Sequence, residues 1–147
     1  LSTQREGWKL DFTSFRVHLK RKYQVERAYL FLGNVPGNER LYTSLEEMGY
    51  IVVLKPTLQD KEGRTLKGNC DAELVLHCMI QYPNFDRAVV VSGDGDFHCL
   101  IEYLERNTKL LKIGIPNRNH YSALLRKFRQ YFFFVSDLRH RLEHQKR

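Results

Sequence analysis

The sequence has few cysteines and no long apolar run, and each shortage excludes a class of protein. The three cysteines, Cys70, Cys78 and Cys99, form no CxxC pair and are odd in number. Neither a disulfide framework nor a zinc site is therefore indicated. No segment approaches the ~18 consecutive apolar residues of a membrane-spanning helix, and no signal peptide is recognisable. We therefore expect a protein of the reducing cytoplasm with no membrane partner.

What is present is the composition of a globular protein with an excess of positive charge. Hydrophobic residues make up 42% of the 147 residues and charged residues 28%. This length and composition predict a single domain over residues 1–147, ending in a charged helical tail at 136–147. The net charge of +7 favours a polyanionic partner such as a nucleic acid.

Hydrophobic periodicity predicts alternating helices and strands. The expected helices are 11–23, 39–48, 71–82, 97–106 and 121–130, and the expected strands are 28–32, 50–54, 88–92, 109–115 and 131–135. Short strands joined by helices are parallel, because a parallel pair needs a crossover connection. The predicted fold class is α/β, a three-layer, Rossmann-like domain with a mostly parallel central sheet flanked by helices.

Two of these helices have clear expected faces. In helix 11–23 we expect Asp11 to cap the first turn and a solvated basic face to be formed by Arg16, Lys20, Arg21 and Lys22. In helix 39–48 we expect a buried stripe of Leu41, Leu45 and Met48.

The most informative stretch runs from Arg87 to Phe97 and reads RAVVVSGDGDF. Its β-branched run predicts a strand buried on both faces, which stops at Ser92. Ligands of open parallel sheets bind beyond the carboxyl ends of the strands, where Asp94 and Asp96 would stand. Two carboxylates flanked by glycines favour a divalent cation or a phosphate as the ligand.

A simple turn is the competing interpretation of the same residues. Ser, Gly and Asp are ordinary turn formers, and Asp96 can cap the following helix by accepting hydrogen bonds from its first amides. That explanation accounts for one aspartate better than for two. An EF-hand loop beginning at Asp94 is excluded, because its sixth position requires glycine and is Cys99.

A third aspartate follows the long irregular segment 55–69. This segment leads through Lys67 and Asn69 to Asp71, in the first turn of the helix predicted at 71–82. The helix dipole favours acidic residues at that position whatever else they do, so Asp71 taken alone is a structural residue. Basic residues that would neutralise RNA phosphates if they gather near the aspartates are Lys55, Arg64, Lys67, Lys112 and Arg118.

The sequence KGNCD followed by VSGDGDF, within an α/β frame, resembles the NYN domain of the bacterial, LabA-like branch of the PIN-like nucleases. The resemblance covers the chain from about Asp11 to Leu142. It implies an endoribonuclease that hydrolyses RNA with Mg²⁺ or Mn²⁺ held by clustered aspartates. The implied metal ligands and catalytic residues are Asp71, Asp94 and Asp96, and the candidates for substrate binding are Lys67, Asn69, Ser92 and Arg118.

One element of that family is not found in the sequence. Its nucleases have a first strand, ending in an aspartate, between the strands that correspond here to 28–32 and 88–92. Residues 8–11 are too short and polar to form it, and a missing middle strand would leave two edges unpaired. Because the sequence starts with Leu1 instead of Met, we expect an N-terminal segment of the native chain to supply the strand. The alternative is a strand from a neighbouring chain, as in a homodimer.

Two other function classes remain open at this point. A catalytically inactive RNA-binding or adaptor domain of the same fold would bind RNA without needing tight Mn²⁺ binding. A phosphatase or phosphotransferase for small molecules would turn over a nucleotide monophosphate faster than an oligonucleotide.

Overall fold

The computed structural model describes residues 9–64, 66 and 69–143. All pairings between its named strands are parallel, so the predicted α/β architecture of parallel sheets flanked by helices is confirmed. No helix in the described part of the chain has the length and apolar character required to cross a membrane. The strands are β1 (Ala28–Gly33), β2 (Tyr50–Lys55), β3 (Ala88–Val91), β4 (Leu110–Ile115) and β5 (Phe132–Phe134), and the α-helices are α1 (Phe12–Tyr23), α2 (Glu39–Glu47), α3 (Asp71–Gln81), α4 (His98–Arg106) and α5 (Arg139–Leu142).

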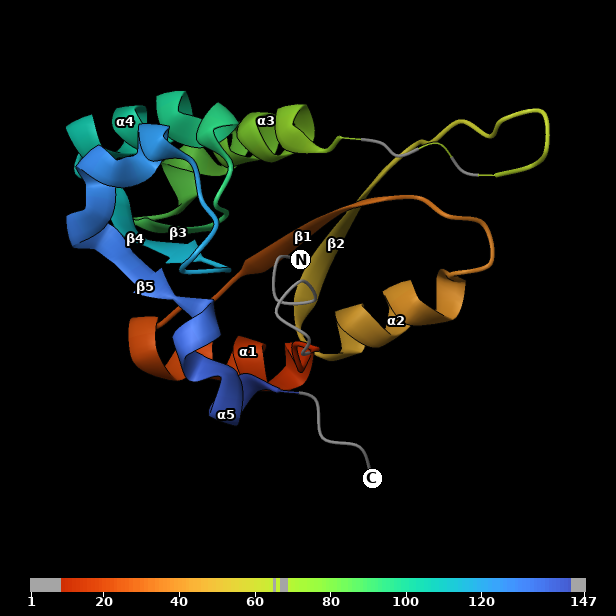
Figure 1. Cartoon of the computed structure of the whole chain (residues 1–147), viewed down its shortest axis with the longest axis horizontal. Coiled ribbons are helices and arrows are strands. Elements are labelled where there is room, and N and C mark those ends of the chain that lie inside the picture. The colour runs from red at the N-terminus through yellow and green to blue at the C-terminus, as the bar shows by residue number, and fades with distance from the viewer. Residues whose placement is uncertain (1–8, 65, 67–68, 144–147) are drawn as a thin grey trace. The chain divides into compact units, whose positions relative to one another are not determined.

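These elements fall into two compact units, each with its own sheet. The β1–β2 unit is Phe15–Met79, and the β3–β5 unit comprises Leu1–Ser14 and Ile80–Arg147. Strands β1 and β2 lie side by side in the first unit, and the second has the strand order β3, β4, β5 (Figure 1). Among the described residues no further strand pairs with β1 or with the second edge of β3. The expected middle strand therefore stays a prediction.

The β1–β2 unit is built on the predicted crossover. Helix α2 connects two strands that pair from Ala28 opposite Tyr50 to Gly33 opposite Lys55. Gly49 follows the helix with φ of +102°, a conformation that residues with a Cβ rarely adopt. The glycine therefore turns the chain directly from α2 into β2.

The predicted buried stripe of α2 is wrong at Leu41, which is 50% exposed. Leu45 is buried as predicted, and Tyr42 is buried where Leu41 was expected. The Tyr42 hydroxyl donates to the Gly33 carbonyl at 3.2 Å and accepts from the Val35 N–H at 2.8 Å. A tyrosine can be buried readily when its hydroxyl is satisfied in this way, and a hydrophobic pattern does not reveal that.

The basic face of α1 is not purely solvated, because Arg16 donates hydrogen bonds to three backbone carbonyls. Its guanidinium donates to the carbonyls of Gly49 at 3.2 Å, Val25 at 3.0 Å and Glu26 at 2.8 Å. Asp11 caps this helix as predicted, since its carboxylate accepts from the Thr13 N–H at 3.1 Å. Arg16 is therefore a structural residue, and the prediction of a solvated side chain is wrong for it.

The β3–β5 unit has the more completely buried core. Five of its aliphatic side chains have no exposed surface, namely Ile101, Leu104, Ile113, Ile115 and Leu125. They come from α4, from β4 and from a 3₁₀ helix at Ala123–Tyr131. An α-helix was predicted over residues 121–130. A helix does form there, but it is a 3₁₀ helix, so the predicted helix type is wrong.

The described part of the charged tail is helical up to Leu142 and is anchored there. A 3₁₀ turn at Val135–Leu138 leads into α5, and Leu142 is only 1% exposed. Leu142 also accepts a hydrogen bond through its carbonyl from the Asp11 N–H at 2.6 Å. The tail is therefore packed onto its unit through Leu142, and residues 144–147 lie outside the described part of the chain.

Candidate metal centre

The loop after β3 holds two of the predicted carboxylates. The Ser92 hydroxyl accepts from the Asp94 N–H at 3.0 Å, and the Asp94 carboxylate accepts from the Asp96 N–H at 2.9 Å. Asp94 thereby caps the short 3₁₀ helix Gly95–Phe97 that leads into α4. The turn interpretation of the sequence had Asp96 as the capping residue. This is wrong, because the backbone N–H of Asp96 donates the hydrogen bond and the side chain of Asp94 accepts it.

Capping uses only one of the four carboxylate oxygens in this loop. Within the described residues, the second oxygen of Asp94 and both oxygens of Asp96 have no protein hydrogen bond. Both side chains are exposed, and an oxygen of Asp94 lies within 4.8 Å of an oxygen of Asp96. One divalent ion with metal–oxygen bonds of ~2.0–2.6 Å, or an ion with a coordinated water, can join oxygens at such a spacing.

Two glycines fix this loop against the segment that follows β4. A Cβ on Gly95 would lie 2.9 Å from the Cβ of Ser122, and one on Gly93 would lie 3.2 Å from the Cβ of Tyr121. The Ser122 N–H also donates to the Gly93 carbonyl at 2.9 Å. The glycines thus allow a close backbone approach that holds Asp94 and Asp96 in place.

Asp71 belongs to the β1–β2 unit, where it is the first residue of α3. Its N–H donates to the side-chain oxygen of Asn69 at 2.7 Å, so Asn69 serves as the cap of this turn. The Asp71 side chain is half-buried. Lys67 lies outside the described residues, and its role in phosphate binding stays a prediction.

Glu73 is a further carboxylate at the start of α3 that the sequence reasoning missed. Its side chain lies 3.7 Å from the Lys55 ammonium, which also donates to the Asn69 carbonyl. In the part of the chain that the structure describes, the second Glu73 oxygen is buried with no hydrogen-bond partner. The available signal was a second acidic residue in the first turn of the helix, two positions after Asp71.

Cys70 stands beside these acidic groups without being a suitable metal ligand. Burial raises the pKa of its thiol, and the negative charge of Glu73 raises that pKa further. Cysteine binds metals as the thiolate, which a raised pKa disfavours. The chemistry of this turn is therefore that of oxygen ligands.

Arg118 was predicted to bind phosphate, and it is paired within the β3–β5 unit. Its guanidinium makes two hydrogen bonds to Asp137, one of them at 3.0 Å, and lies 3.9 Å from the centre of the Phe134 ring. The hydrogen bond from Arg118 holds the pKa of Asp137 below its usual value. Arg64 is likewise paired, with Asp60 at 2.8 Å and Glu62 at 3.5 Å. Their positive charges are therefore partly balanced.

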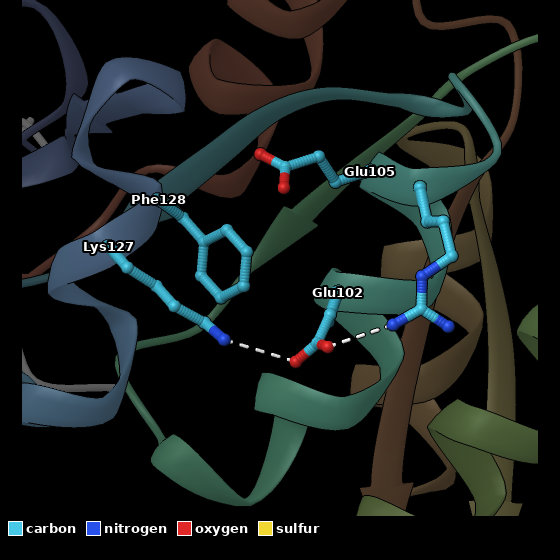
Figure 2. Close-up of a pocket in the computed structure, with 5 residues that line it drawn as sticks. Glu102, Glu105, Lys127 and Phe128 are labelled. Atoms are coloured by element: carbon cyan, nitrogen blue, oxygen red, sulfur yellow. Dashed lines mark hydrogen bonds and ion pairs between the residues drawn. The ribbon is translucent and has the colours of Figure 1, made fainter.

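A pocket of about 300 Å³ lies in the β3–β5 unit, apart from the loop of Asp94 and Asp96 (Figure 2). It is lined by Glu102, Glu105, Arg106, Lys127 and Phe128. Glu102 pairs with Arg106 at 3.0 Å and with Lys127 at 3.1 Å, so its charge is already compensated. Glu105 is seven residues beyond His98, the first residue of α4, which at ~1.5 Å per helical residue is about 10 Å along the helix. The pocket is therefore separate from the acidic loop.

Comparison with known families decides what kind of domain this is. The family model of the NYN domain matches residues 1–137. The chain belongs to the NYN domain family. An NYN domain is a nuclease-type domain of the PIN-like group, and its members typically act as hydrolases. The acidic loop and the start of α3 thus lie within a domain of nuclease type.

A solved structure supports the same fold for this NYN domain. It is the crystal structure of a protein of unknown function from Vibrio parahaemolyticus, with a TM-score of 0.74 and 24% sequence identity. The match covers 97% of this chain and 87% of that chain. Comparison with curated proteins gave no match.

Proposed function

We propose that this NYN domain is a Mg²⁺- or Mn²⁺-dependent endoribonuclease of the bacterial cytoplasm, with Asp71, Asp94 and Asp96 as its cation ligands and catalytic residues. The observation that carries the proposal is the exposed Asp94–Asp96 pair beyond β3, whose remaining oxygens have no partner among the described residues. Membership of a nuclease-type family supports the same reaction class.

The donor set fits a hard cation. Mg²⁺ and Mn²⁺ prefer carboxylate oxygens and keep several waters, which exposed side chains permit. When bound, such an ion neutralises charge on the scissile phosphate and lowers the pKa of a water for attack on phosphorus. The chain itself supplies the oxygens of Asp94 and Asp96, and Ser92 orients the loop through the Asp94 N–H.

The β1–β2 unit contributes the remaining groups in this proposal. Asn69 orients the first turn of α3 so that Asp71 offers its carboxylate, and it is also a candidate contact for the RNA backbone. Lys67 is proposed to neutralise phosphates, together with Arg118 of the β3–β5 unit. The net charge of +7 supports RNA as the partner, since counterion release drives the binding of nucleic acids.

The experiment is cleavage of a labelled RNA by the full protein with Mn²⁺ or Mg²⁺, and with a chelator. Asp96→Asn should reduce the cleavage rate by about 100-fold or more, the scale of losing one electrostatic stabiliser of a transition state. Asp86→Asn is the matched control, because Asp86 is an exposed aspartate of the same unit outside the loop. Cleavage that persists in chelator, or in Asp96→Asn, would contradict the proposal.

The same assay separates the alternatives. An adaptor domain would bind RNA without cleaving it and would be indifferent to Mn²⁺. A phosphatase would release phosphate from a nucleotide monophosphate faster than it cut an oligonucleotide.

A further inference from the structure

An aromatic cluster lies beside the acidic loop within the β3–β5 unit. The aromatic cluster consists of Tyr121, Phe132 and Phe134. The ring centroids are 5.4 Å apart for Tyr121–Phe132, 5.8 Å for Phe132–Phe134 and 6.4 Å for Tyr121–Phe134. These are the spacings of edge-to-face and tilted aromatic pairs, which hold the rings in fixed orientations.

The cluster touches the loop that carries the proposed cation ligands. Because β3, β4 and β5 are parallel, their carboxyl ends lie at one edge of the sheet. Tyr121 lies against Gly93, since a Cβ on that glycine would be 3.2 Å from the Tyr121 Cβ. Gly93 directly precedes Asp94. The aromatic cluster therefore contacts the residue that comes directly before the proposed cation ligand Asp94.

A cation is fixed at the other side of the cluster. The Arg118 guanidinium lies 3.9 Å from the centre of the Phe134 ring, and Asp137 holds it there. The Arg118 side chain remains 53% exposed. The aromatic cluster thus contacts the acidic loop through Tyr121 and carries a guanidinium at Phe134. Aromatic rings and a cation provide the two contacts that single-stranded nucleic acids use, which are base stacking and phosphate attraction.

Core packing alone does not explain the exposure of these rings. The core of this unit consists of aliphatic side chains such as Ile113 and Ile115, which have no exposed surface. Tyr121, Phe132 and Phe134 each keep part of their surface open to solvent. Partly exposed aromatic side chains beside polar groups are typical of binding sites.

We propose that the aromatic cluster stacks one base of a single-stranded RNA, the base next to the phosphate that lies at Asp94 and Asp96. This inference rests on the proposed nuclease function and names its substrate class. Bases in a duplex have both faces covered by their neighbours, so a stacking site of this kind selects RNA that is single-stranded at the cleavage site.

The experiment compares kcat/KM for an RNA oligonucleotide with that for the same oligonucleotide lacking one base, moved stepwise past the cleavage site. With the wild-type protein, removing the stacked base should lower kcat/KM about tenfold at a single position. Tyr121→Leu should lower kcat/KM for the intact RNA by a similar factor and make it insensitive to that base. Tyr121→Phe keeps the ring and should behave as the wild type.

A control variant is Tyr103→Leu, since Tyr103 is an exposed aromatic residue of the same unit outside the cluster. It should retain the wild-type dependence on the base. The inference is overturned if the RNA is cleaved but removal of no single base lowers kcat/KM. It is also overturned if Tyr121→Leu and base removal lower kcat/KM independently, so that their two factors multiply. The test with wild-type protein needs no variant to fold. If the wild-type protein cleaves no RNA at all, the proposed function fails as well.

Discussion

The two acidic turns of this protein are capped in opposite ways. In the β3–β5 unit, the proposed ligand Asp94 is itself the cap and gives one oxygen to the Asp96 N–H. In the β1–β2 unit, the cap is Asn69, and it accepts from the N–H of the proposed ligand Asp71. A substitution at Asp94 therefore changes both the helix cap and a proposed cation ligand. At the second turn these two roles belong to different residues, because Asn69 is the cap and Asp71 is the proposed ligand.

The turns also differ in how firmly their backbones are held. The Asp94 loop is packed through Gly93 and Gly95 against Tyr121 and Ser122. The turn at Asn69 is held mainly by Lys55, which donates to its carbonyl and pairs with Glu73. The backbone of the Asp94 loop is therefore fixed by close packing, while the turn at Asn69 depends on a few polar contacts.

The largest effect on stability is expected at the glycine of the tighter turn. Gly95→Ala would place a Cβ 2.9 Å from the Ser122 Cβ, where the backbone cannot readily move. We expect overpacking to cost about 1–3 kcal/mol of unfolding free energy, measured by urea denaturation. Gly63→Ala in the β1–β2 unit is the comparison, because it has no close neighbour and only the strain of φ +81°. Equal losses in both variants would contradict the tight packing of the Asp94 loop.

A smaller effect separates capping from ligand chemistry. Asn69→Ala and Asp94→Ala should each lower the unfolding free energy by about 1 kcal/mol, the usual value of a lost N-cap. Asp94→Asn should leave the cation-free protein as stable as the wild type or slightly more stable, since asparagine also caps and a negative charge is removed. A clear loss of stability in Asp94→Asn, with cleavage retained, would make Asp94 a purely structural residue.

The smallest effect concerns pH and the Arg118–Asp137 pair. The hydrogen bond from Arg118 lowers the pKa of Asp137 in the folded protein. The pair therefore stabilises the fold above the unfolded pKa of about 3.9 and loses this effect as the pH falls through the lower folded pKa. Melting temperatures of wild type and Asp137→Asn should differ slightly at pH 6 and converge once the pH has fallen below the folded pKa of Asp137. A difference that grows towards low pH would contradict the assignment.

The secondary structure could be predicted well because strong periodic patterns determine it. The crossover of β1, α2 and β2 and the capped start of α1 at Asp11 follow from local rules of burial and capping. Leu41 and Tyr42 show where such rules fail, because a hydroxyl bonded to Gly33 and Val35 depends on contacts that a helical pattern does not contain. The 3₁₀ winding of Ala123–Tyr131 was missed because its side-chain pattern resembles that of an α-helix.

The position of the acidic loop could be predicted from the sequence, and its detailed contacts could not. The loop of Asp94 and Asp96 lies after β3 as expected, since a β-branched strand followed by Gly-Asp-Gly-Asp is a strong local signal. The predicted burial of this strand on both faces is wrong, because only Val90 of β3 is buried. The exchange of capping roles between Asp94 and Asp96 was not visible, because either aspartate can accept from a nearby amide. The pairing of Arg118 with Asp137 joins residues 19 positions apart, which no local pattern indicates.

The most direct test of the central claim is whether both turns bind one cation. Mn²⁺ should raise the melting temperature of the full protein by mass action, because only the folded state holds the ligands together. Asp71→Asn and Asp96→Asn should each weaken the apparent Mn²⁺ affinity by at least about tenfold, and Asp86→Asn should leave it unchanged. If one ion is shared, the double variant should bind Mn²⁺ only a little more weakly than the weaker-binding of the two single variants. Wild-type Mn²⁺ affinity in Asp71→Asn would contradict the shared site.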